Sequence, residues 1–263
     1  MIEKMIDGWA FWQEIAKRLS KRQRTNFFFS EEEVFLLVQQ EKFSRFDFAD
    51  SSYFFLKEDQ FYRLFYFLDK ENSPEVLPAF AEPIILEEVL LANKERLPSR
   101  EDWEKVGFQA YLERKRMYIM SKNVIKEERK ITFARENLLE DIFQLMLESF
   151  EPFSSALPTK EALLADILNQ RVLVSLQNQK LLGFLHFGEM KQGSMLWHIA
   201  VKPEARGLGV GEGLVRDWLF VQKDIAKKFF LWVRTDNLSA LRMYDKFGFL
   251  PDGRLAPVMI KTT

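Results

Sequence analysis

Pro203-Glu204-Ala205-Arg206-Gly207-Leu208-Gly209-Val210-Gly211-Glu212-Gly213 joins a predicted strand to a predicted helix. The strand ends in Ile199-Ala200-Val201, and one face of the helix carries Leu214, Val215, Trp218 and Leu219. Glycines let a backbone approach a ligand without an intervening Cβ, and the first turn of a helix offers unpaired N–H groups and the positive end of its dipole. The loop is therefore predicted to bind a phosphate, with Arg206 adding a full positive charge.

Two other kinds of phosphate loop do not fit this stretch. A dinucleotide-binding fingerprint needs glycines at positions n, n+2 and n+5, and no glycine of the loop begins such a series. A P-loop ends in Gly-Lys-Ser or Gly-Lys-Thr, and the sequence contains neither tripeptide. The loop therefore belongs to another class of phosphate-binding site.

Two motifs resemble those of the GNAT superfamily of acyl-CoA-dependent N-acyltransferases. Residues 206–211 resemble its R/Q-x-x-G-x-G/A loop, and residues 237–249 resemble its N-x-x-A-x-x-x-Y-x-x-x-G-F segment. The resemblance covers roughly residues 126–263. It implies an α/β (α+β) fold with a mixed, mostly antiparallel sheet flanked by helices. Predicted strands at 172–176, 181–187 and 195–201, separated by polar turns, indicate an antiparallel meander within it.

The resemblance also implies roles for single residues. Acetyl-CoA would be the co-substrate, without a metal, and Tyr244 would be the general acid that protonates the departing CoA thiolate. Strand residues would pair with the pantetheine arm and polarise the thioester carbonyl, and Asn237 would hold the pantetheine from the other side. The cofactor-binding residues implied in this way are Ile199, Ala200, Val201, Arg206, Gly207, Leu208, Gly209, Val210, Gly211 and Asn237.

The general base is left open by the sequence. Where many relatives carry Glu-Val-Arg, this chain has Trp232-Val233-Arg234, and the fourth-strand positions used by others fall on Met195 or Trp197. His198 has the opposite strand parity to Trp197 and Ile199, so its ring is expected on the other face of the sheet, where a structural role is typical. We rank Glu189 first as the base, with Glu148 and Glu151 as alternatives. A water chain or an amine that arrives neutral would also serve.

The first half of the chain has a different composition. Nine of the 11 glycines lie from Gly183 onward, whereas twelve of the 26 phenylalanines lie between Phe27 and Phe67. A charged run favours a boundary at residue 125, which gives domains 1–125 and 126–263. Residues 103–108 align with residues 244–249, and the position equivalent to the glycine loop has no glycine. Residues 1–125 are therefore interpreted as a degenerate GNAT-like or accessory domain without a CoA loop, which makes two tandem GNAT-like domains.

Composition narrows the function further. The 263 residues include no cysteine, which excludes a cysteine nucleophile, and only two histidines, which disfavours a metal site. The net charge of −1 argues against nucleic acid and anionic membranes as partners, and charged residues interrupt any N-terminal signal peptide. We predict a cytoplasmic acetyltransferase that acts on a primary amine of a small molecule or peptide by direct attack. The sequence is compatible with a homodimer. The alternative is a non-catalytic acyl-CoA-binding regulatory protein.

Overall fold

The chain divides into two compact units in the computed structural model. The structure describes residues 8–20, 23–27, 29–40, 42–48, 51–69, 72–91, 100–123, 131–191 and 193–262. Unit 1 consists of Met1–Glu113 and Arg254–Thr263, and unit 2 consists of Arg114–Gly253. The predicted boundary at residue 125 lies outside the described residues. The two units meet along the chain between Glu113 and Arg114, and the C-terminal ten residues join unit 1.

Unit 2 is built on a five-stranded path of the sheet. Strands β8, β9 and β10 pair antiparallel in that order, as the predicted meander requires. The next strand, β11, runs parallel to β10 and antiparallel to β7. The predicted mixed, mostly antiparallel sheet is thereby confirmed. The bounds are β7 (Gln109–Met120), β8 (Val172–Gln177), β9 (Lys180–Met190), β10 (Gly193–Val201) and β11 (Lys228–Arg234).

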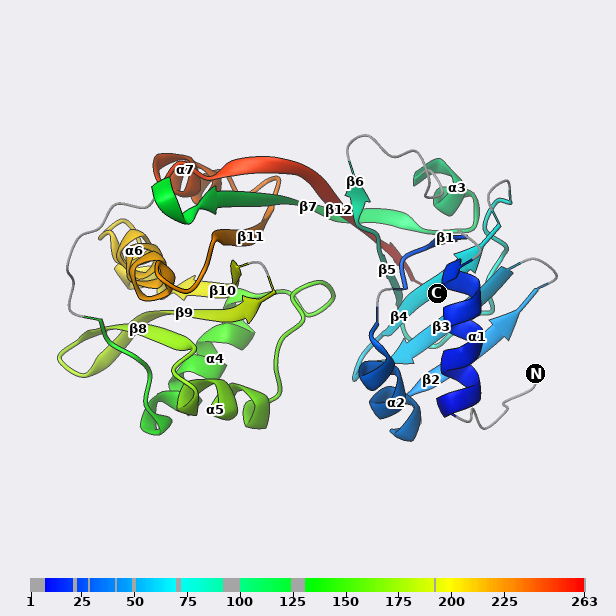
Figure 1. Ribbon diagram of the computed structural model, residues 1–263, viewed down its shortest axis with the longest axis horizontal. Coiled ribbons are helices and arrows are strands. Elements are labelled where there is room, and N and C mark those ends of the chain that lie inside the picture. Colours follow the sequence, from blue (N-terminus) through cyan, green and yellow to red (C-terminus); the bar gives the residue numbers. More distant parts are fainter. Residues whose placement is uncertain are drawn as a thin grey trace. The chain divides into compact units, whose positions relative to one another are not determined.

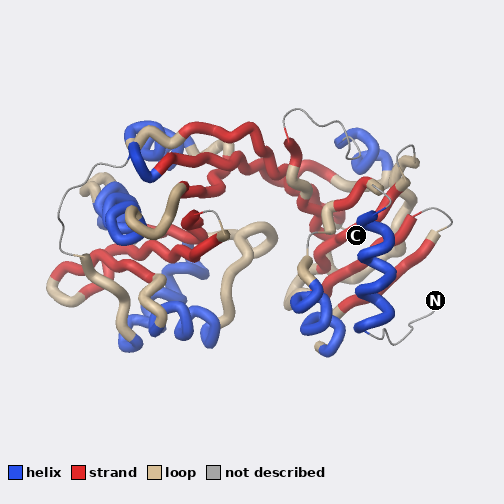
Figure 2. Tube along the Cα trace, viewed as in Figure 1, coloured by secondary structure: helices blue, strands red, loops and turns tan. Residues whose placement is uncertain are grey.

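Helices cover both faces of this sheet (Figures 1 and 2). On one face lie α4 (Leu139–Ser149) and α5 (Lys160–Leu168), which bury Ile142 and Leu163 against Phe184 of β9. The other face carries α6 (Val210–Gln222) and α7 (Leu238–Lys246). Short 3₁₀ turns at Ser121–Asn123, Glu136–Leu138 and Pro203–Ala205 link the elements. None of the described helices is long and apolar enough to cross a membrane.

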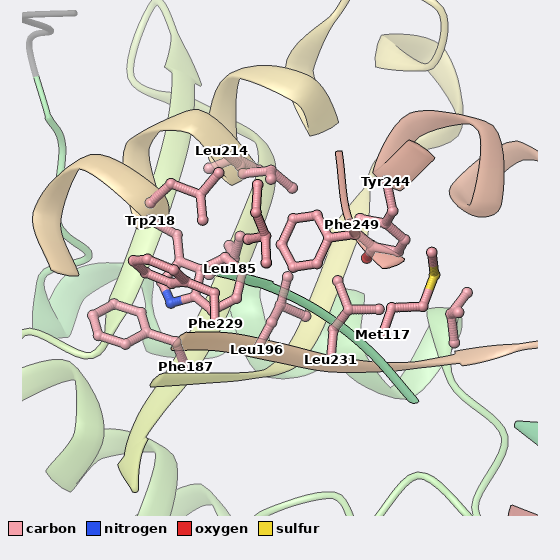
Figure 3. Close-up of a cluster of buried hydrophobic side chains, with 14 of the residues drawn as sticks. Met117, Leu185, Phe187, Leu196, Leu214, Trp218, Phe229, Leu231, Tyr244 and Phe249 are labelled. Atoms are coloured by element: carbon pink, nitrogen blue, oxygen red, sulfur yellow. The ribbon is translucent and has the colours of Figure 1, made fainter. Parts of the chain in front are cut away.

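The core beneath α6 and α7 is rich in aromatic rings (Figure 3). Trp218 of α6 packs edge-on against Phe229 of β11, with ring centroids 5.1 Å apart. Its Nε1–H donates to Ser194 Oγ at 2.9 Å, so the one polar atom of this buried ring has a partner. Tyr244 of α7 packs against Phe249 in the same cluster. This packing fixes α6 and α7 on the sheet, and with them the loops that begin each helix.

Unit 1 contains the phenylalanine-rich sequence. Strands β2, β3 and β4 pair antiparallel, and β5 runs parallel to β4. Side chains alternate between two cores: Phe54 packs with α1 and α2, and Phe55 packs in the cluster that contains Trp103 of α3. The bounds are α1 (Gly8–Ser20), β1 (Arg24–Thr25), α2 (Glu31–Gln39), β2 (Phe43–Asp47), β3 (Ser51–Lys57), β4 (Tyr62–Leu68), β5 (Ile84–Glu87), β6 (Leu90–Leu91), α3 (Arg100–Lys105) and β12 (Leu250–Lys261).

Each unit includes a strand from the other half of the sequence. Residues 114–120 of β7 pair with β11 in unit 2, although β7 lies in the N-terminal half of the sequence. Residues 258–261 at the end of β12 pair antiparallel with β5 in unit 1. The last strand of each half, β7 or β12, thus has residues in both units. Dividing the sequence at one point therefore does not separate the units.

The short repeat noticed in the sequence has the same backbone geometry in both places. Phe108 N–H donates to Trp103 O at 3.1 Å, and Phe249 N–H donates to Tyr244 O at 3.1 Å. The intervening Gly107 and Gly248 have φ of 95° and 82°, a left-handed conformation that favours glycine. The segment between β4 and β5 differs from its counterpart, because its described residues contain no helix equivalent to α6.

Candidate active site

A cavity of about 1460 Å³ lies in unit 2. Its walls are the second half of β10, the end of β11, the glycine loop with the start of α6, the first turns of α7, and the loop that follows α4. Segments from across the sequence of unit 2 therefore surround one space. Among the described residues, no group of three or more His, Cys, Asp or Glu side chains is placed to hold a metal ion.

The two parallel strands that line the cavity separate halfway along it. β10 pairs with β11 from Ser194↔Phe229 to Leu196↔Leu231, and in the described structure the pairing ends there. β11 nevertheless continues to Arg234, and β10 continues to Val201 along β9. The register between β10 and β9 shifts between Leu196 and His198, so Trp197 is the extra residue of a β-bulge. The edge of β10 beyond the bulge therefore faces the cavity instead of a neighbouring strand.

The glycine loop lies at one end of this opening. Gly207 and Gly209 have φ of 78° and 79°, and Gly209 is the N-cap of α6. Among the described residues beyond the chain neighbours, no atom lies within 4 Å of the Cβ position at either glycine, so the left-handed backbone, not crowding, calls for glycine there. The exposed Arg206 donates from Nε to the carbonyl oxygen of Val201 at 3.3 Å, which holds its side chain back along the end of β10. The N-terminal amides of α6 and the Arg206 guanidinium together suit an anionic group such as a pyrophosphate.

Most residues that the resemblance implicates meet at this cavity. Ile199, Ala200, Val201, Arg206, Gly207, Gly209, Val210, Gly211, Asn237 and Tyr244 all line it. Leu208 is 72% exposed and is not among the lining residues. Asn237 is the N-cap of α7, where its Oδ1 accepts from Ala240 N–H at 3.1 Å. Tyr244 is buried, and this burial raises the pKa of its phenol, so the hydroxyl keeps its proton at neutral pH.

The structure separates the candidate bases that the sequence grouped together. Glu189 is exposed on β9, opposite Ser194, and is not among the residues that line the cavity. Glu148 accepts from Gln144 Nε2 at 2.8 Å and also lies outside the lining. Glu151 does line the cavity, but its carboxylate accepts from the backbone N–H groups of Phe153 and Ser154. Its visible role is to shape the loop after α4.

Sequence reasoning missed a histidine pair that lines the cavity. His186 and His198 face each other across β9 and β10, with 3.3 Å between their Nδ1 atoms. His186 Nε2 lies 3.1 Å from Asp166 Oδ2 of α5, and His198 Nε2 lies 2.8 Å from the carbonyl oxygen of Ser155. As expected from parity, His198 lies on the opposite face to Ile199, but that face also borders the cavity. The same expectation is wrong for Trp197, because the bulge turns its ring against His186, on the face of His198. The signal available in the sequence was that the only two histidines fall on adjacent strands of a predicted meander.

Burial controls the charge of this pair. Desolvation lowers the pKa of His186, although Asp166 opposes the shift. Desolvation also lowers the pKa of His198, to about 4, and the positive charges of a protonated His186 and of Arg114 add to the effect. Both rings are therefore neutral at neutral pH. Trp197 packs edge-on against His186 at 4.8 Å between centroids, and Phe150 packs against His198 at 5.2 Å, so aromatic rings flank the pair.

Comparison with known proteins agrees with the geometry. Residues 139–249 match the model of the Acetyltransferase (GNAT) family. A candidate ribosomal protein bS18-alanine N-acetyltransferase of Bacillus subtilis (strain 168) is 32% identical over 124 residues, which cover 45% of this chain and 81% of that protein.

Solved structures of the same kind share the fold at low identity. A GCN5-related N-acetyltransferase from Sphaerobacter thermophilus aligns with a TM-score of 0.59 at 12% identity, over 80% of this chain and 76% of that one. One from Kribbella flavida aligns with a TM-score of 0.53 at 13% identity, over 88% and 95%. A tandem GNAT protein from the clavulanic acid biosynthesis pathway aligns with a TM-score of 0.50 at 9% identity, over 80% and 78%. The last of these fits a fold of two units.

Proposed function

Because the chain belongs to the GNAT family of acetyltransferases, we propose that unit 2 transfers an acetyl group from acetyl-CoA to a primary amine of a small molecule or peptide. The observation that carries the proposal is the parting of β10 and β11 beside a glycine loop, within one cavity. The family membership supports acetyl transfer itself. The donor, the class of acceptor and the mechanism are the proposal.

The donor would be held by backbone groups more than by side chains. The unpaired edge of β10 beyond Trp197 offers N–H and C=O groups to the amides of a pantetheine arm, as a missing strand would. The start of α6 offers its N–H groups to the pyrophosphate, with Arg206 beside them. Asn237, at the start of α7, also lines the cavity and would contact the pantetheine arm. These contacts would place the thioester between β10 and Tyr244.

The chemistry is a direct attack of the amine on the thioester carbonyl. A backbone N–H of β10 would polarise the carbonyl, and Tyr244 would supply the proton that the departing thiolate takes up. The buried phenol is protonated at neutral pH, as a general acid must be. No enzyme nucleophile is needed, which fits a chain without cysteine. Glu189 as the base stays a prediction from the sequence, and so do the cytoplasmic location and the homodimer.

A peptide acceptor has support from one relative. The Bacillus subtilis protein carries the name of an enzyme that acts on an alanine of a ribosomal protein. Trp197, Trp232 and the loop after α4 line the cavity of unit 2, and we expect the acceptor to bind beside them. A panel of peptides with free N-termini and small primary amines would separate the two classes of acceptor.

The strand order of unit 1 indicates its origin. We infer that it is a degenerate copy of the same unit, because it repeats the order of two antiparallel pairs and one parallel pair and the glycine turn after a short helix. The described residues between β4 and β5 offer neither a glycine nor a helix in place of the phosphate loop. It would therefore not bind CoA in the manner of unit 2.

A change at Gly209 tests the proposed donor site. Gly209→Asp places a carboxylate where the pyrophosphate would lie and adds a side chain at a φ of 79°. We expect calorimetry to show no acetyl-CoA binding by this variant. Gly209→Ala adds the same backbone strain without the charge, and it should weaken binding without abolishing it.

The two variants have clear contrary outcomes. Intact binding of acetyl-CoA by Gly209→Asp would show that the phosphate site lies elsewhere. Binding by the wild type without any CoA thiol release across the amine panel would favour the non-catalytic regulatory protein instead. Release of thiol with any amine acceptor would exclude that alternative.

A further inference from the structure

The hydrogen bonds at the two ends of the histidine pair determine where its protons lie. The carbonyl oxygen of Ser155 can only accept, so His198 carries its proton on Nε2. An ionised Asp166 can also only accept, so His186 carries its proton on Nε2 as well. A neutral imidazole has one N–H group. Both Nδ1 atoms are therefore bare when the rings are neutral.

The two bare nitrogens point at each other. The ring planes differ by 18°, and the centroids are 5.5 Å apart. The 3.3 Å between the Nδ1 atoms plus the radii of the two rings accounts for nearly all of that separation. The rings thus meet edge to edge, with both lone pairs directed into the gap between them. One proton in this gap would be held by both nitrogens, and there is no place for a second.

Charged side chains of both signs surround the pair. The carboxylate of Asp166 lies against His186 and compensates a positive charge there, while Arg171 shares that carboxylate at 3.0 Å. Arg114 acts on His198 from β7, and its Nη1–H donates to Ser154 O at 2.8 Å. Glu151 lies on the same loop, with Ser155 Oγ 3.4 Å from its Oε1. The Asp166 carboxylate stabilises a positive charge on the histidine pair, whereas Arg114 and Arg171 destabilise it.

We propose that His186 and His198 together accept the proton that the acceptor amine gives up, with Asp166 as the positioning residue that keeps Nδ1 of His186 free. Both rings line the cavity into which the acceptor must enter. An N–H bond of the ammonium group breaks, and its proton goes to the gap between the Nδ1 atoms. The amine lone pair then forms the N–C bond as the C–S bond breaks, and the thiolate takes its proton from Tyr244. The nitrogen, which still carries one proton too many for an amide, releases that second proton to the Tyr244 oxygen and so restores the phenol. This inference rests on the proposed acetyl transfer.

Kinetics of His186→Gln and His198→Gln test the proposal. Each variant should lose about 100-fold or more in kcat/KM for the amine at pH 7, the usual contribution of a general base. The loss should shrink about tenfold per pH unit as the pH rises, up to the pKa of the amine, because the amine then reaches the site neutral. The affinity for acetyl-CoA, measured by calorimetry, should stay within about twofold of the wild type and also reports folding.

Variants of α5 separate positioning from simple stability. Asp166→Asn replaces the acceptor of the His186 proton, so it should lower kcat/KM and recover at high pH as the histidine variants do. Glu161→Gln on the same helix changes an exposed carboxylate outside the cavity and should leave the pH profile unchanged. A loss in Asp166→Asn that is equal at every pH would overturn the proposed role. The same pH-dependent loss in Glu189→Gln, with active histidine variants, would make Glu189 the base.

Nuclear magnetic resonance tests the pair without any catalytic assay. The chain has only two histidines, so ¹⁵N-histidine labelling reports these two rings alone. Both rings should carry the proton on Nε2 at pH 7.5, and acidification should shift both Nδ1 signals together in one step of one proton. Two independent steps, or a bare Nε2 on either ring, would overturn the shared site.

Failure of the inference differs from failure of the proposed function. A wild type that binds no acetyl-CoA and releases no thiol with any amine would remove the acetyl transfer, whatever the histidine spectra show. An active wild type whose histidine variants keep both the rate and the pH profile would remove the histidine pair and leave the acetyl transfer intact.

Discussion

Tyr244 is both a buried core residue and a residue of the cavity lining. Its ring belongs to the core, against Phe249 at 5.7 Å, while its side chain also lines the cavity. Burial stabilises the neutral phenol over the phenolate, so the pKa of the hydroxyl is raised. A raised pKa makes it a weak acid in the ground state. Its usefulness to the leaving thiolate would then depend on being close to it, because a thiolate in the same dry site is a strong base.

Tyr244→Phe should separate the hydroxyl from the ring. The phenylalanine keeps the contact with Phe249, so we expect the thermal stability and the acetyl-CoA affinity of the wild type. The kcat should fall by about 100-fold, the lower end of the usual contribution of a general acid. Steady-state kinetics beside calorimetry measure the two quantities. A variant that turns over at the wild-type rate would remove Tyr244 as the acid.

The two halves of strand β10 have different roles. Its first half, from Gly193 to Leu196, is an ordinary sheet strand between β9 and β11. The bulge at Trp197 then bends it, and its second half lines the cavity. Gly188 on β9 accommodates the bulge, because a Cβ there would meet the Trp197 ring at 2.0 Å. The opening of the site is thus a property of two adjacent strands, and not of one residue.

Gly193→Ala tests how closely the paired half of β10 is held. A Cβ at this position would lie 2.0 Å from the carbonyl oxygen of Lys228, which is backbone and cannot move aside alone. We expect a loss of about 1–3 kcal/mol in the free energy of unfolding, as for other overpacked positions. Urea unfolding followed by tryptophan fluorescence measures it, since Trp218 packs on β11.

Gly211→Ala is the matched control for that stability measurement. Its Cβ would meet only Met243 Sδ at 3.5 Å and Val201 Cγ2 at 3.7 Å, which are ordinary contacts. Alanine is also the better residue in a helix, so the free energy of unfolding should be unchanged or higher. Equal free energies of unfolding for Gly193→Ala and Gly211→Ala would show that the backbone at the start of β10 shifts at little cost.

At the scale of the whole molecule, each unit includes a segment from a distant part of the sequence. Unit 1 is complete only with the last ten residues of the chain. Val258 and Met259 are buried there, and Pro257 O accepts from Glu88 N–H at 3.2 Å. Glu88 is itself 4% exposed, and its Oε1 accepts from Tyr66 Oη at 2.6 Å and Trp103 Nε1 at 3.1 Å. A carboxyl group thus lies in the core of a unit without an identified site.

Glu88 should make the stability of unit 1 depend on pH. Burial raises the pKa of Glu88 to about 7, from 4.5 for an exposed glutamate. The folded state therefore holds the proton more tightly than the unfolded state, so this stabilisation is complete below about pH 4.5 and is lost as the pH rises through 7. The difference of about 2.5 pKa units corresponds to about 3 kcal/mol.

Glu88→Gln removes this dependence while keeping an oxygen for Tyr66 and Trp103. Hydrogen exchange of β4 amides between pH 5 and 8 should show the wild type losing protection relative to the variant as the pH rises, after correction for intrinsic exchange. The buried histidines of unit 2 act in the opposite sense, because their lowered pKa removes stability as the pH falls below about 6.5. Parallel curves for the wild type and Glu88→Gln would contradict the raised pKa of Glu88.

The sequence by itself determined the family, the class of fold, the antiparallel meander and the position of the glycine loop. These features are local: glycines at 207, 209 and 211, alternating apolar residues and a short spaced motif carry them within a few residues of chain. They also identified Asn237 and Tyr244 as residues of one site, because the motif places both on a helix after β11.

Only the tertiary structure decided which polar side chains share the cavity. Glu189 and Glu151 are chemically equal candidates in the sequence, but one lies outside the cavity lining and the other is bonded to its own loop. The histidine pair needs α5 and two strands to meet, and a bulge to set the register of His198 against His186. The exchange of final strands between the units is equally invisible in the sequence, because a strand pattern records its own periodicity and not its partner. Pairing between distant segments is settled by packing of the whole chain.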